Sequence, residues 1–314
     1  MRKKVILDMD PGIDDALAIL LAFRSPELDV LGITIVSGNV HASKGAINAL
    51  RTLNVLKIKE DVPVYIGQDK PLLRPLITAE WVHGSDGLGD ANIPMPSRKP
   101  EEGNGVKFIV DTVMNSKQSE ITLIATGPLT NIATALLLEP KIAKRVKELI
   151  LMGGAFGLTP YGIGNATPVS EFNFYTDPEA AKIVFESGIP ITAVGLDVTT
   201  NPQTIITKEI YEKMTTSSSE IHRFAVKIMK NLVDRFGYMQ LHDPMAIAIA
   251  IDQSFFKTSK YYVTIATNDD DTRGQAIVER REWLPEEFKK SPNANIANWV
   301  DGPGFLQFFL ERIR

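Results

Sequence analysis

Short uncharged runs alternate with longer segments of helical spacing over the first two thirds of this chain, and this alternation limits the fold more than any other feature. The runs VILD, LGITIV, ITLIAT and ELILMGG are continuously apolar rather than alternating in polarity. Parallel strands that are buried on both faces read in this way. Because helical segments separate the strands, the pattern predicts an α/β fold: a Rossmann-like, mostly parallel sheet with helices on both faces.

The boundaries of the expected elements follow from the same pattern. The expected strands are Val5–Leu7, Val30–Ser37, Val64–Ile66, Ile121–Ala125, Glu148–Met152 and Ile191–Gly195. The expected helices are Ala16–Arg24, Ala42–Leu53, Gly105–Ser116, Asn131–Glu139, Glu179–Ser187 and, where the pattern turns helical after about Thr207, Ile221–Phe236. Two segments rich in turn residues are expected to be long loops, which are often functional: Lys70–Glu102 and Phe156–Asp177. Neither a repeat nor a composition break divides the chain, so we expect a single domain over residues 1–314.

Composition excludes several classes of function. The chain has no cysteine, which rules out disulfides, thiolate metal sites and cysteine nucleophiles. A formal net charge of -4 gives no electrostatic reason to expect binding to nucleic acid or to a membrane. Only Val5–Leu7 follow the basic start, which is too short for a signal peptide, and no apolar run approaches the ~20 residues of a membrane span. We therefore expect a soluble, cytoplasmic protein.

Four aspartates lie within eight residues directly after the first expected strand, in the segment DMDPGIDDA that runs from Asp8 to Ala16. Asp14 and Asp15 alone could simply place negative charge in the first turn of a helix. That reading does not explain Asp8 and Asp10, which precede the turn. Several carboxylates at one site are tolerable when a hard divalent cation neutralises them.

Other strands also end in polar residues, and in open α/β sheets ligands bind at the carboxyl ends of the strands. The turn at Pro11-Gly12 could direct Asp10 and Asp15 toward one point, and Asp243 could supply a third carboxylate. With no cysteine and only four histidines, these ligands favour Ca²⁺ or Mg²⁺ over zinc.

The remaining candidates are single residues. His41 and His222 are expected to be solvated surface groups, whereas His242 adjoins Asp243 and His83 lies in a glycine-rich loop. Trp81 could be plain packing or a contact above a ligand. Structural roles are expected for the segment Thr272-Arg273-Gly274 and for Trp299.

Five motifs resemble those of one enzyme family, the calcium-dependent nucleoside hydrolases that prefer inosine and uridine. They are DMDPGIDDA, ATGPLTNIA at Ala125–Ala133, MGGA at Met152–Ala155, NATPVSEFNFYTDPEAA at Asn165–Ala181 and HDPMAIA at His242–Ala248, in the family's order. The resemblance covers nearly the whole chain. It implies a single-domain nucleoside hydrolase fold, hydrolysis of ribonucleosides to free base and ribose, a Ca²⁺ cofactor, and a homodimer or homotetramer.

The resemblance also implies roles for individual residues. The Ca²⁺ ligands would be the carboxylates of Asp10, Asp15 and Asp243 and the carbonyl of Thr126, with Asp10 also acting as the base for the attacking water. The ribose would be bound by Asp14, Asn39, Met152, Asn165, Glu171, Phe172 and Asn173. His242 would lie near the base, as would His83 on a mobile loop. The two histidines favour a pyrimidine-leaning or broad specificity.

The chemistry gives a reason for the crowded carboxylates. Cleavage of an N-ribosidic bond develops positive charge on the sugar, so it needs an activated water on one face and help for the leaving group on the other. A bound calcium would lower the pKa of that water, and the surrounding acids would favour the sugar cation.

Two other functions remain as alternatives to this one. A haloacid-dehalogenase-like phosphotransferase would also place an Asp-x-Asp pair after its first strand, here Asp8 and Asp10, but Gly12 stands where that family usually has Thr or Val. A nucleoside-binding relative without activity would be expected to lack Asp10 or a metal ligand.

Overall fold

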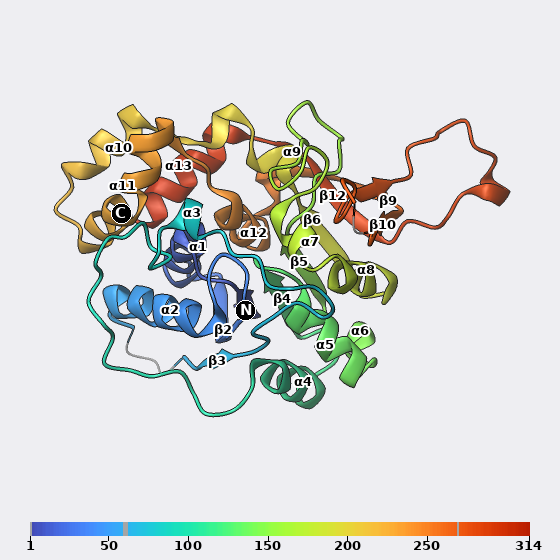
Figure 1. Cartoon of the computed structure of the whole chain (residues 1–314), viewed down its shortest axis with the longest axis horizontal. Coiled ribbons are helices and arrows are strands. Elements are labelled where there is room, and N and C mark those ends of the chain that lie inside the picture. Colours follow the sequence, from blue (N-terminus) through green and yellow to red (C-terminus); the bar gives the residue numbers. More distant parts are fainter. Residues whose placement is uncertain (1, 59–61, 269) are drawn as a thin grey trace.

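A mostly parallel sheet runs through the centre of the computed structural model, which describes residues 2–58, 62–268 and 270–314 (Figure 1). Within these ranges, eight strands pair in the order β3-β2-β1-β4-β5-β6-β12-β9. All neighbouring pairs are parallel except β12 with β9. The strands are β1 Lys3–Met9, β2 Leu28–Ile35, β3 Val64–Ile66, β4 Ile121–Ala125, β5 Glu148–Met152, β6 Ile191–Val194, β9 Phe256–Tyr261 and β12 Ala294–Val300. The predicted fold class is confirmed.

Each face of the sheet is buried in its own hydrophobic core. On β1, Val5, Leu7 and Met9 belong to one core, whereas Ile6 belongs to the other, and all four are fully buried. Neither face of the strand meets water, which explains why the strands read as continuous apolar runs.

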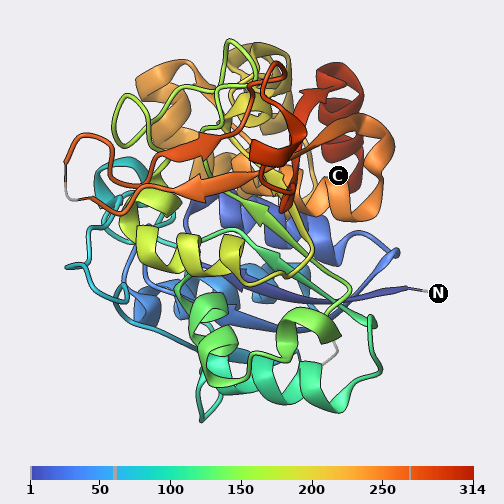
Figure 2. The same cartoon turned by 90° about the vertical axis from the view of Figure 1, so that its right-hand side faces the viewer.

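Helices cover both faces of the sheet. One face packs against α1 Ile13–Phe23, α2 Ala42–Leu56, α10 Lys208–Thr215, α11 Glu220–Phe236, α12 His242–Ile251 and α13 Gly302–Arg312. The other packs against α4 Gly105–Asn115, α5 Thr130–Leu138, α6 Ile142–Arg145, α8 Pro178–Glu186 and the hairpin of β10 Val263–Ile265 with β11 Ala276–Val278. Figure 2 shows the green helices α4 to α6 and the orange and red C-terminal helices on opposite sides of the strands.

The remaining elements are short. They are α3 Glu80–His83, α7 Phe172–Thr176, α9 Leu196–Thr199, the antiparallel pair β7 Ile206–Thr207 and β8 Tyr238–Met239, and the 3₁₀ turns η1 Pro202–Thr204, η2 Gln253–Phe255 and η3 Glu286–Phe288. In the described ranges, no helix combines the length and apolar character needed to cross a membrane.

The structure corrects the expected elements at four places. The chain after Thr207 is not purely helical, since it adds β9 and β12 to the main sheet. The expected loop Phe156–Asp177 ends in α7, and Lys70–Glu102 contains α3. Helix α1 begins three residues earlier than Ala16, directly after the turn at Gly12.

The prediction that His222 is a solvated surface group is wrong. His222 is 7 % exposed on the inner side of α11, and burial lowers the pKa of its imidazole. His41 is exposed, as expected. The polar residues around His222 in the sequence conceal that its helix turns this position inward.

Candidate active site

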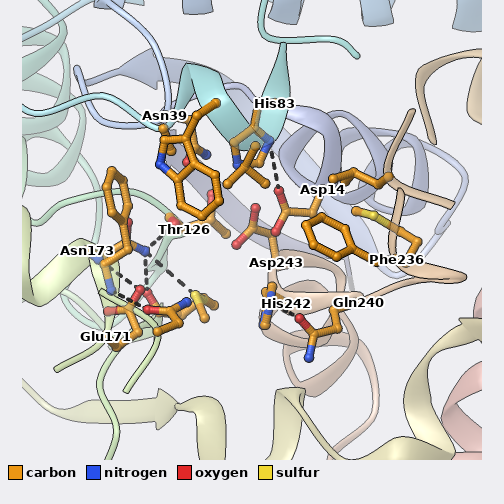
Figure 3. Close-up of a pocket in the computed structure, with 18 of the residues that line it drawn as sticks. Asp14, Asn39, His83, Thr126, Glu171, Asn173, Phe236, Gln240, His242 and Asp243 are labelled. Atoms are coloured by element: carbon orange, nitrogen blue, oxygen red, sulfur yellow. Dashed lines mark hydrogen bonds and ion pairs between the residues drawn. The ribbon is translucent and has the colours of Figure 1, made fainter. Parts of the chain in front are cut away.

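A cavity of about 270 Å³ lies at the carboxyl ends of the central strands, where the loops after β1, β2, β4 and β5 meet (Figure 3). The lining residues expected from the sequence are Asp14, Asn39, His83, Thr126, Met152, Asn165, Glu171, Phe172, Asn173, His242 and Asp243. The structure thus brings together residues that lie far apart in the chain, as a parallel sheet requires.

Asp10 and Asp15 are fully buried and lie behind this wall rather than on it. The Asn39 N–H donates to Asp10 Oδ2 at 2.6 Å, and the Thr126 hydroxyl donates to Asp15 Oδ1 at 2.8 Å. Both expected ligands are therefore held by residues that do line the cavity.

The carboxylate of Asp10 fits a space that two glycines leave open. A Cβ on Gly38 would overlap Asp10 Oδ2, and one on Gly127 would lie 2.7 Å from Asp10 Oδ1. Asp10 Oδ1 is buried and has no hydrogen-bond partner among the described residues. Burial and the negative charges of Asp15 and Asp14 raise the pKa of this carboxyl well above its usual value.

Asp15 is held from three sides at the start of α1. Its Oδ2 accepts from the Gly12 N–H at 2.9 Å and from Asn39 Nδ2 at 3.1 Å, in addition to the Thr126 bond to Oδ1. A carboxylate in the first turn that receives a backbone N–H also stabilises the helix end. The bond from the Gly12 N–H therefore stabilises the start of α1, and the three bonds together fix the orientation of the Asp15 carboxylate.

Asp14, Asp15 and Asp243 form a buried acidic cluster in which one carboxylate oxygen from each residue lies within 4.8 Å of the other two. Burial, then repulsion from Asp14, Asp15 and Asp10, raises the pKa of Asp243 well above its usual value. In the described part of the chain, the Oδ1 of Asp14 has no hydrogen-bond partner, and no lysine or arginine lines the cavity. Hard oxygen donors that repel one another in a buried site are the donor set that a divalent cation stabilises, so this cluster could hold a metal ion.

The acidic cluster differs from the expected set of carboxylate ligands in one residue: it contains Asp14, whereas the expected set contains Asp10. The carbonyl of Thr126, the fourth expected ligand, accepts a hydrogen bond from Asn173 Nδ2 at 2.8 Å. A carbonyl oxygen has two lone pairs, so this bond leaves one for another partner.

Opposite the acidic cluster, the residues expected to bind a sugar lie on and around α7. Asn173 Nδ2 donates to the carbonyls of Thr126 and Met152, at 2.8 and 3.2 Å. Both partners can only accept, so the amide orientation of Asn173 is fixed and its Oδ1 points away from them. Glu171 caps the helix, and Asn165 Oδ1 accepts the Phe172 N–H at 2.9 Å.

His83 at the end of α3 has a defined protonation state. Its Nδ1 accepts the N–H of Ile13 at 3.1 Å. A backbone N–H can only donate, so Nδ1 carries no proton and the neutral ring carries it on Nε2. Burial and the nearby His242 lower the pKa of His83 to about 4, which keeps the ring neutral above that pH.

His242 opens α12 from the other side of the cavity. Its Nδ1 lies 2.8 Å from the hydroxyl of Thr199, and its Nε2 lies 3.2 Å from Gln240 Oε1. Burial lowers the pKa of His242 to about 4. Thr199 was not expected from the sequence, because a threonine in a short helix has no distinctive spacing.

The rest of the cavity wall, called its apolar end here, is mostly apolar and aromatic. It is lined by Ala79, Trp81, Val82, Leu232, Phe236, Tyr238, Met239 and Gln240. Trp81 was a single candidate from the sequence, and five of the other residues lie between Leu232 and Gln240, on α11, on β8 and just after it. Trp81 is 67 % exposed, so it forms part of the rim rather than of a packed core.

Arg235 joins two parts of this rim. Its Nη1 donates to the Trp81 carbonyl at 2.9 Å, and its guanidinium lies 5.6 Å from the Trp81 ring and 4.7 Å from the Phe236 ring. The contacts connect α3, which carries His83, to the end of α11.

A family model described as inosine-uridine preferring nucleoside hydrolase matches residues 5–307. The chain belongs to this family. As a nucleoside hydrolase it is an enzyme that hydrolyses ribonucleosides, and the predicted family and activity are confirmed. The two alternatives, a phosphotransferase and a binding protein without activity, are wrong.

Relatives of this nucleoside hydrolase differ in the base named for them. The chain is 40% identical to a pyrimidine-specific ribonucleoside hydrolase of Salmonella arizonae, over 100% of this chain and 99% of the relative. It is 38% identical to a probable uridine nucleosidase of Arabidopsis thaliana, over 99% and 98% of the two chains. A solved purine-preferring ribonucleoside hydrolase from Gardnerella vaginalis superposes with a TM-score of 0.88 at 34% identity, over 99% and 98% of the chains.

Proposed function

We propose that this enzyme cleaves the N-glycosidic bond of ribonucleosides in a Ca²⁺-dependent reaction. The ion would be held by the carboxylates of Asp10, Asp15 and Asp243 and by the carbonyl of Thr126. When bound, it supplies positive charge that acidifies a water molecule and orders two sugar hydroxyls. One observation carries the proposal: among the described residues, buried carboxylate oxygens without hydrogen-bond partners lie at a cavity that no lysine or arginine lines.

Asp10 is proposed to take the proton of the attacking water. Its Oδ2 is engaged by the Asn39 N–H, so Oδ1 is the oxygen available to receive a proton. A carboxyl whose pKa is raised by burial is a stronger base than a solvated one once it is ionised. The other carboxylates, Asp14 among them, favour the positive charge that develops on the sugar.

The sugar is proposed to lie between the acidic cluster and α7. Asn173 Oδ1, directed away from the two carbonyls, would accept from a ribose hydroxyl. Asp14, Asn39, Met152, Asn165, Glu171 and Phe172 would form the rest of the sugar site, since all of them line the cavity.

The leaving base is proposed to face His242 and His83. His83 offers an Nε2–H that the Ile13 contact fixes in place, so it would act by donating a hydrogen bond to the base. His242, which has a ring nitrogen within 3.2 Å of Gln240, would assist departure of the base directly.

A pyrimidine-leaning or broad base preference is proposed for the apolar end of the cavity. Support comes from the relatives, two of which are named for pyrimidine nucleosides and one for purines. Steady-state kinetics on uridine, cytidine, inosine and guanosine, compared as kcat/KM, tests this. A purine preference above about tenfold would contradict it.

The Ca²⁺ requirement is tested by removing bound metal with a chelator and measuring release of ribose from uridine. We expect activity to disappear and to return with added Ca²⁺. Full activity in demonstrably metal-free enzyme would refute the metal site. The single domain over residues 1–314, the homodimer or homotetramer and the cytoplasmic location stay predictions.

A further inference from the structure

Helix α7 is too short to hold its own shape. It is a single turn of five residues, and isolated helices of this length are unstable in water. At its N-terminal end, Glu171 accepts the N–H groups of Asn173 and Phe174, at 2.8 and 3.2 Å, and that of Gly154 at 2.9 Å. A turn this short also needs partners at its other end to keep Asn173 in position.

The other end is held by Arg273, from the turn between β10 and β11. Its Nε donates to the Tyr175 carbonyl at 2.9 Å and its Nη2 to the Thr176 carbonyl at 3.3 Å. These are the carbonyls that a helix end leaves without partners of its own. The guanidinium also lies 4.5 Å from the centre of the Tyr175 ring, and Arg273 is only 5 % exposed.

Gly274 brings the same turn into backbone contact with α7. A Cβ at this position would lie 2.6 Å from both Cα and N of Tyr175, closer than carbon atoms approach. Gly274 also has a φ of +77°, which favours glycine. Two independent features therefore fit the turn between β10 and β11 to α7: the buried guanidinium of Arg273 and the absence of a side chain at Gly274.

We infer that Arg273 and Gly274 are positioning residues for the sugar site: they hold α7 so that Asn173 reaches both the Thr126 carbonyl and the cavity. Neither residue lines the cavity, so they act through Asn173 rather than on the substrate. The inference rests on the proposed function, because it assumes that Asn173 contacts the ribose.

The expected effect follows from the geometry. A displacement of about 1 Å in a substrate-positioning group can cost ~10²-fold in rate. We expect Arg273→Gln and Gly274→Ala to lower kcat/KM for uridine by about tenfold to a hundredfold. They should also reduce the preference for uridine over 2′-deoxyuridine by at least about tenfold, since the contact to the hydroxyl is what loosens. The ratio of uridine to inosine should stay within about twofold, because neither residue contacts the apolar end of the cavity.

The chain offers a matched control for each change. Arg145 also donates to carbonyls at the end of a helix, those of Val113 and Ser116 at α4, but α4 contributes nothing to the cavity. Gly188 has a φ of +78°, and a Cβ added there would meet no atom within 4 Å, so Gly188→Ala adds the backbone strain without the collision. Arg145→Gln and Gly188→Ala should lower Tm and leave the uridine to 2′-deoxyuridine ratio within about twofold.

A binding measurement gives a readout that does not depend on turnover. Free ribose should raise the Tm of the Arg145→Gln and Gly188→Ala proteins more than that of the Arg273→Gln and Gly274→Ala proteins. Should Arg273→Gln fail to fold, Arg273→Lys keeps a cationic donor group and should show a smaller loss of the same kind.

Substitution of Asn173 separates the inference from the proposed function. If Asn173→Ala lowers the uridine to 2′-deoxyuridine ratio but Arg273→Gln and Gly274→Ala change it no more than their controls, the inference is wrong and the proposed sugar site stands. If Asn173→Ala itself leaves that ratio unchanged, the assignment of Asn173 in the proposed function is wrong, and the inference falls with it.

Discussion

At the scale of single residues, the two histidines differ in what they can give to a leaving base. His83 is tied at Nδ1 to a backbone N–H and cannot take a second proton there without losing that bond. The two ring nitrogens of His242 instead lie beside side chains, the hydroxyl of Thr199 and the amide of Gln240. Both groups can act as donor or acceptor after a rotation, so they do not fix the protonation state of His242. We therefore propose that His242 transfers a proton to the leaving base and that His83 acts by hydrogen bonding.

Substituting His242 should affect natural substrates far more than activated ones. A natural base leaves poorly without a proton, so His242→Ala should lose roughly 10²–10⁴-fold on uridine, the usual scale of acid catalysis. A nitrophenyl riboside has a leaving group that is already a stable anion, and on it the variant should lose less than about tenfold. Steady-state kinetics on both substrates measures the difference.

Asp10→Ala is the comparison, because loss of the base should impair both substrates alike. If His242→Ala damaged the two substrates equally while still binding Ca²⁺, His242 would be supporting Asp243 rather than the leaving group.

The sugar hydroxyls give a second prediction at this scale. If Asp14 and Asn173 hold the 2′-hydroxyl, its removal leaves buried polar groups unpaired, and such sites reject the analogue by ~10⁴-fold or more. We expect kcat/KM for uridine to exceed that for 2′-deoxyuridine by this margin. Equal values for the two substrates would contradict the assignment.

Residues at the ends of strands were predictable, and those that support them were not. Asp10 and Thr126 come directly after the strands β1 and β4, and Asn39 comes shortly after β2, so the rule that ligands bind at the carboxyl ends of strands finds them. A structural role was expected for Arg273, but its partner Tyr175 lies 98 positions away and the partner of Thr199 lies 43 positions away, so no local pattern predicts either contact.

At the scale of elements, Arg235 determines how α3 and α11 meet above the cavity. Arg235→Ala removes the bond to the Trp81 carbonyl and the contacts to the rings of Trp81 and Phe236. Contacts of this kind contribute ~1–2 kcal/mol, so we expect KM for uridine to rise about fivefold to thirtyfold.

Tryptophan fluorescence can follow the same change if Trp283 and Trp299, which do not line the cavity, are replaced by Phe. Nucleoside should then alter the emission of Trp81, and Arg235→Ala should weaken that response. An Arg235→Ala protein with unchanged KM and unchanged emission would show that α3 is held by other contacts.

The strands that were not predicted have polar side chains among their apolar ones. Strand β12 reads ANIANWV, in which asparagines interrupt the apolar residues. The amide of Asn295 bonds to the Ile191 carbonyl, and that of Asn298 bonds to Ser259. In the sequence, such polar residues look like part of a loop, because their partners inside the fold are not visible there. The continuous apolar runs of β1 and β4 were predictable as strands.

At the scale of the whole molecule, the acidic cluster connects the first residues of the chain to α12, and its charge makes stability depend on pH. Burial, then repulsion from Asp15, raises the pKa of Asp14 to about 7, and burial with repulsion from neighbouring aspartates raises those of Asp10 and Asp243 well above their usual values. The unfolded chain releases these protons near pH 4. Without metal, the stabilising contribution of Asp14 is thus fully present below about pH 4 and is lost as the pH rises through about 7, and those of Asp10 and Asp243 are lost as the pH rises through their raised pKa values.

We therefore expect Ca²⁺ to raise Tm more at pH 8 than at pH 5, because the cation replaces protons on the same oxygens. At 100 times its Kd a ligand adds ~2.7 kcal/mol to the free energy of unfolding. Calorimetry with and without Ca²⁺ at each pH measures the shift. The buried His83 and His242 stabilise the fold above about pH 6.5, and this contribution is lost as the pH falls through about 4. Because it is the same with and without Ca²⁺ at a given pH, it cancels in this comparison. A shift that is larger at pH 5 would contradict the proposed carboxylate ligands.

The two outer strands of the sheet determine how the enzyme avoids aggregation in a crowded solution. One border, β3, has only three residues, and the other, β9, carries exposed Lys257 and Lys260. Open strand borders can recruit strands of other molecules, and both shortness and lysine oppose such recruitment. Because β12 and β9 come late in the chain, β6 has an uncovered border until they are made. A nascent or C-terminally shortened chain would therefore be far more prone to form insoluble assemblies than the finished enzyme.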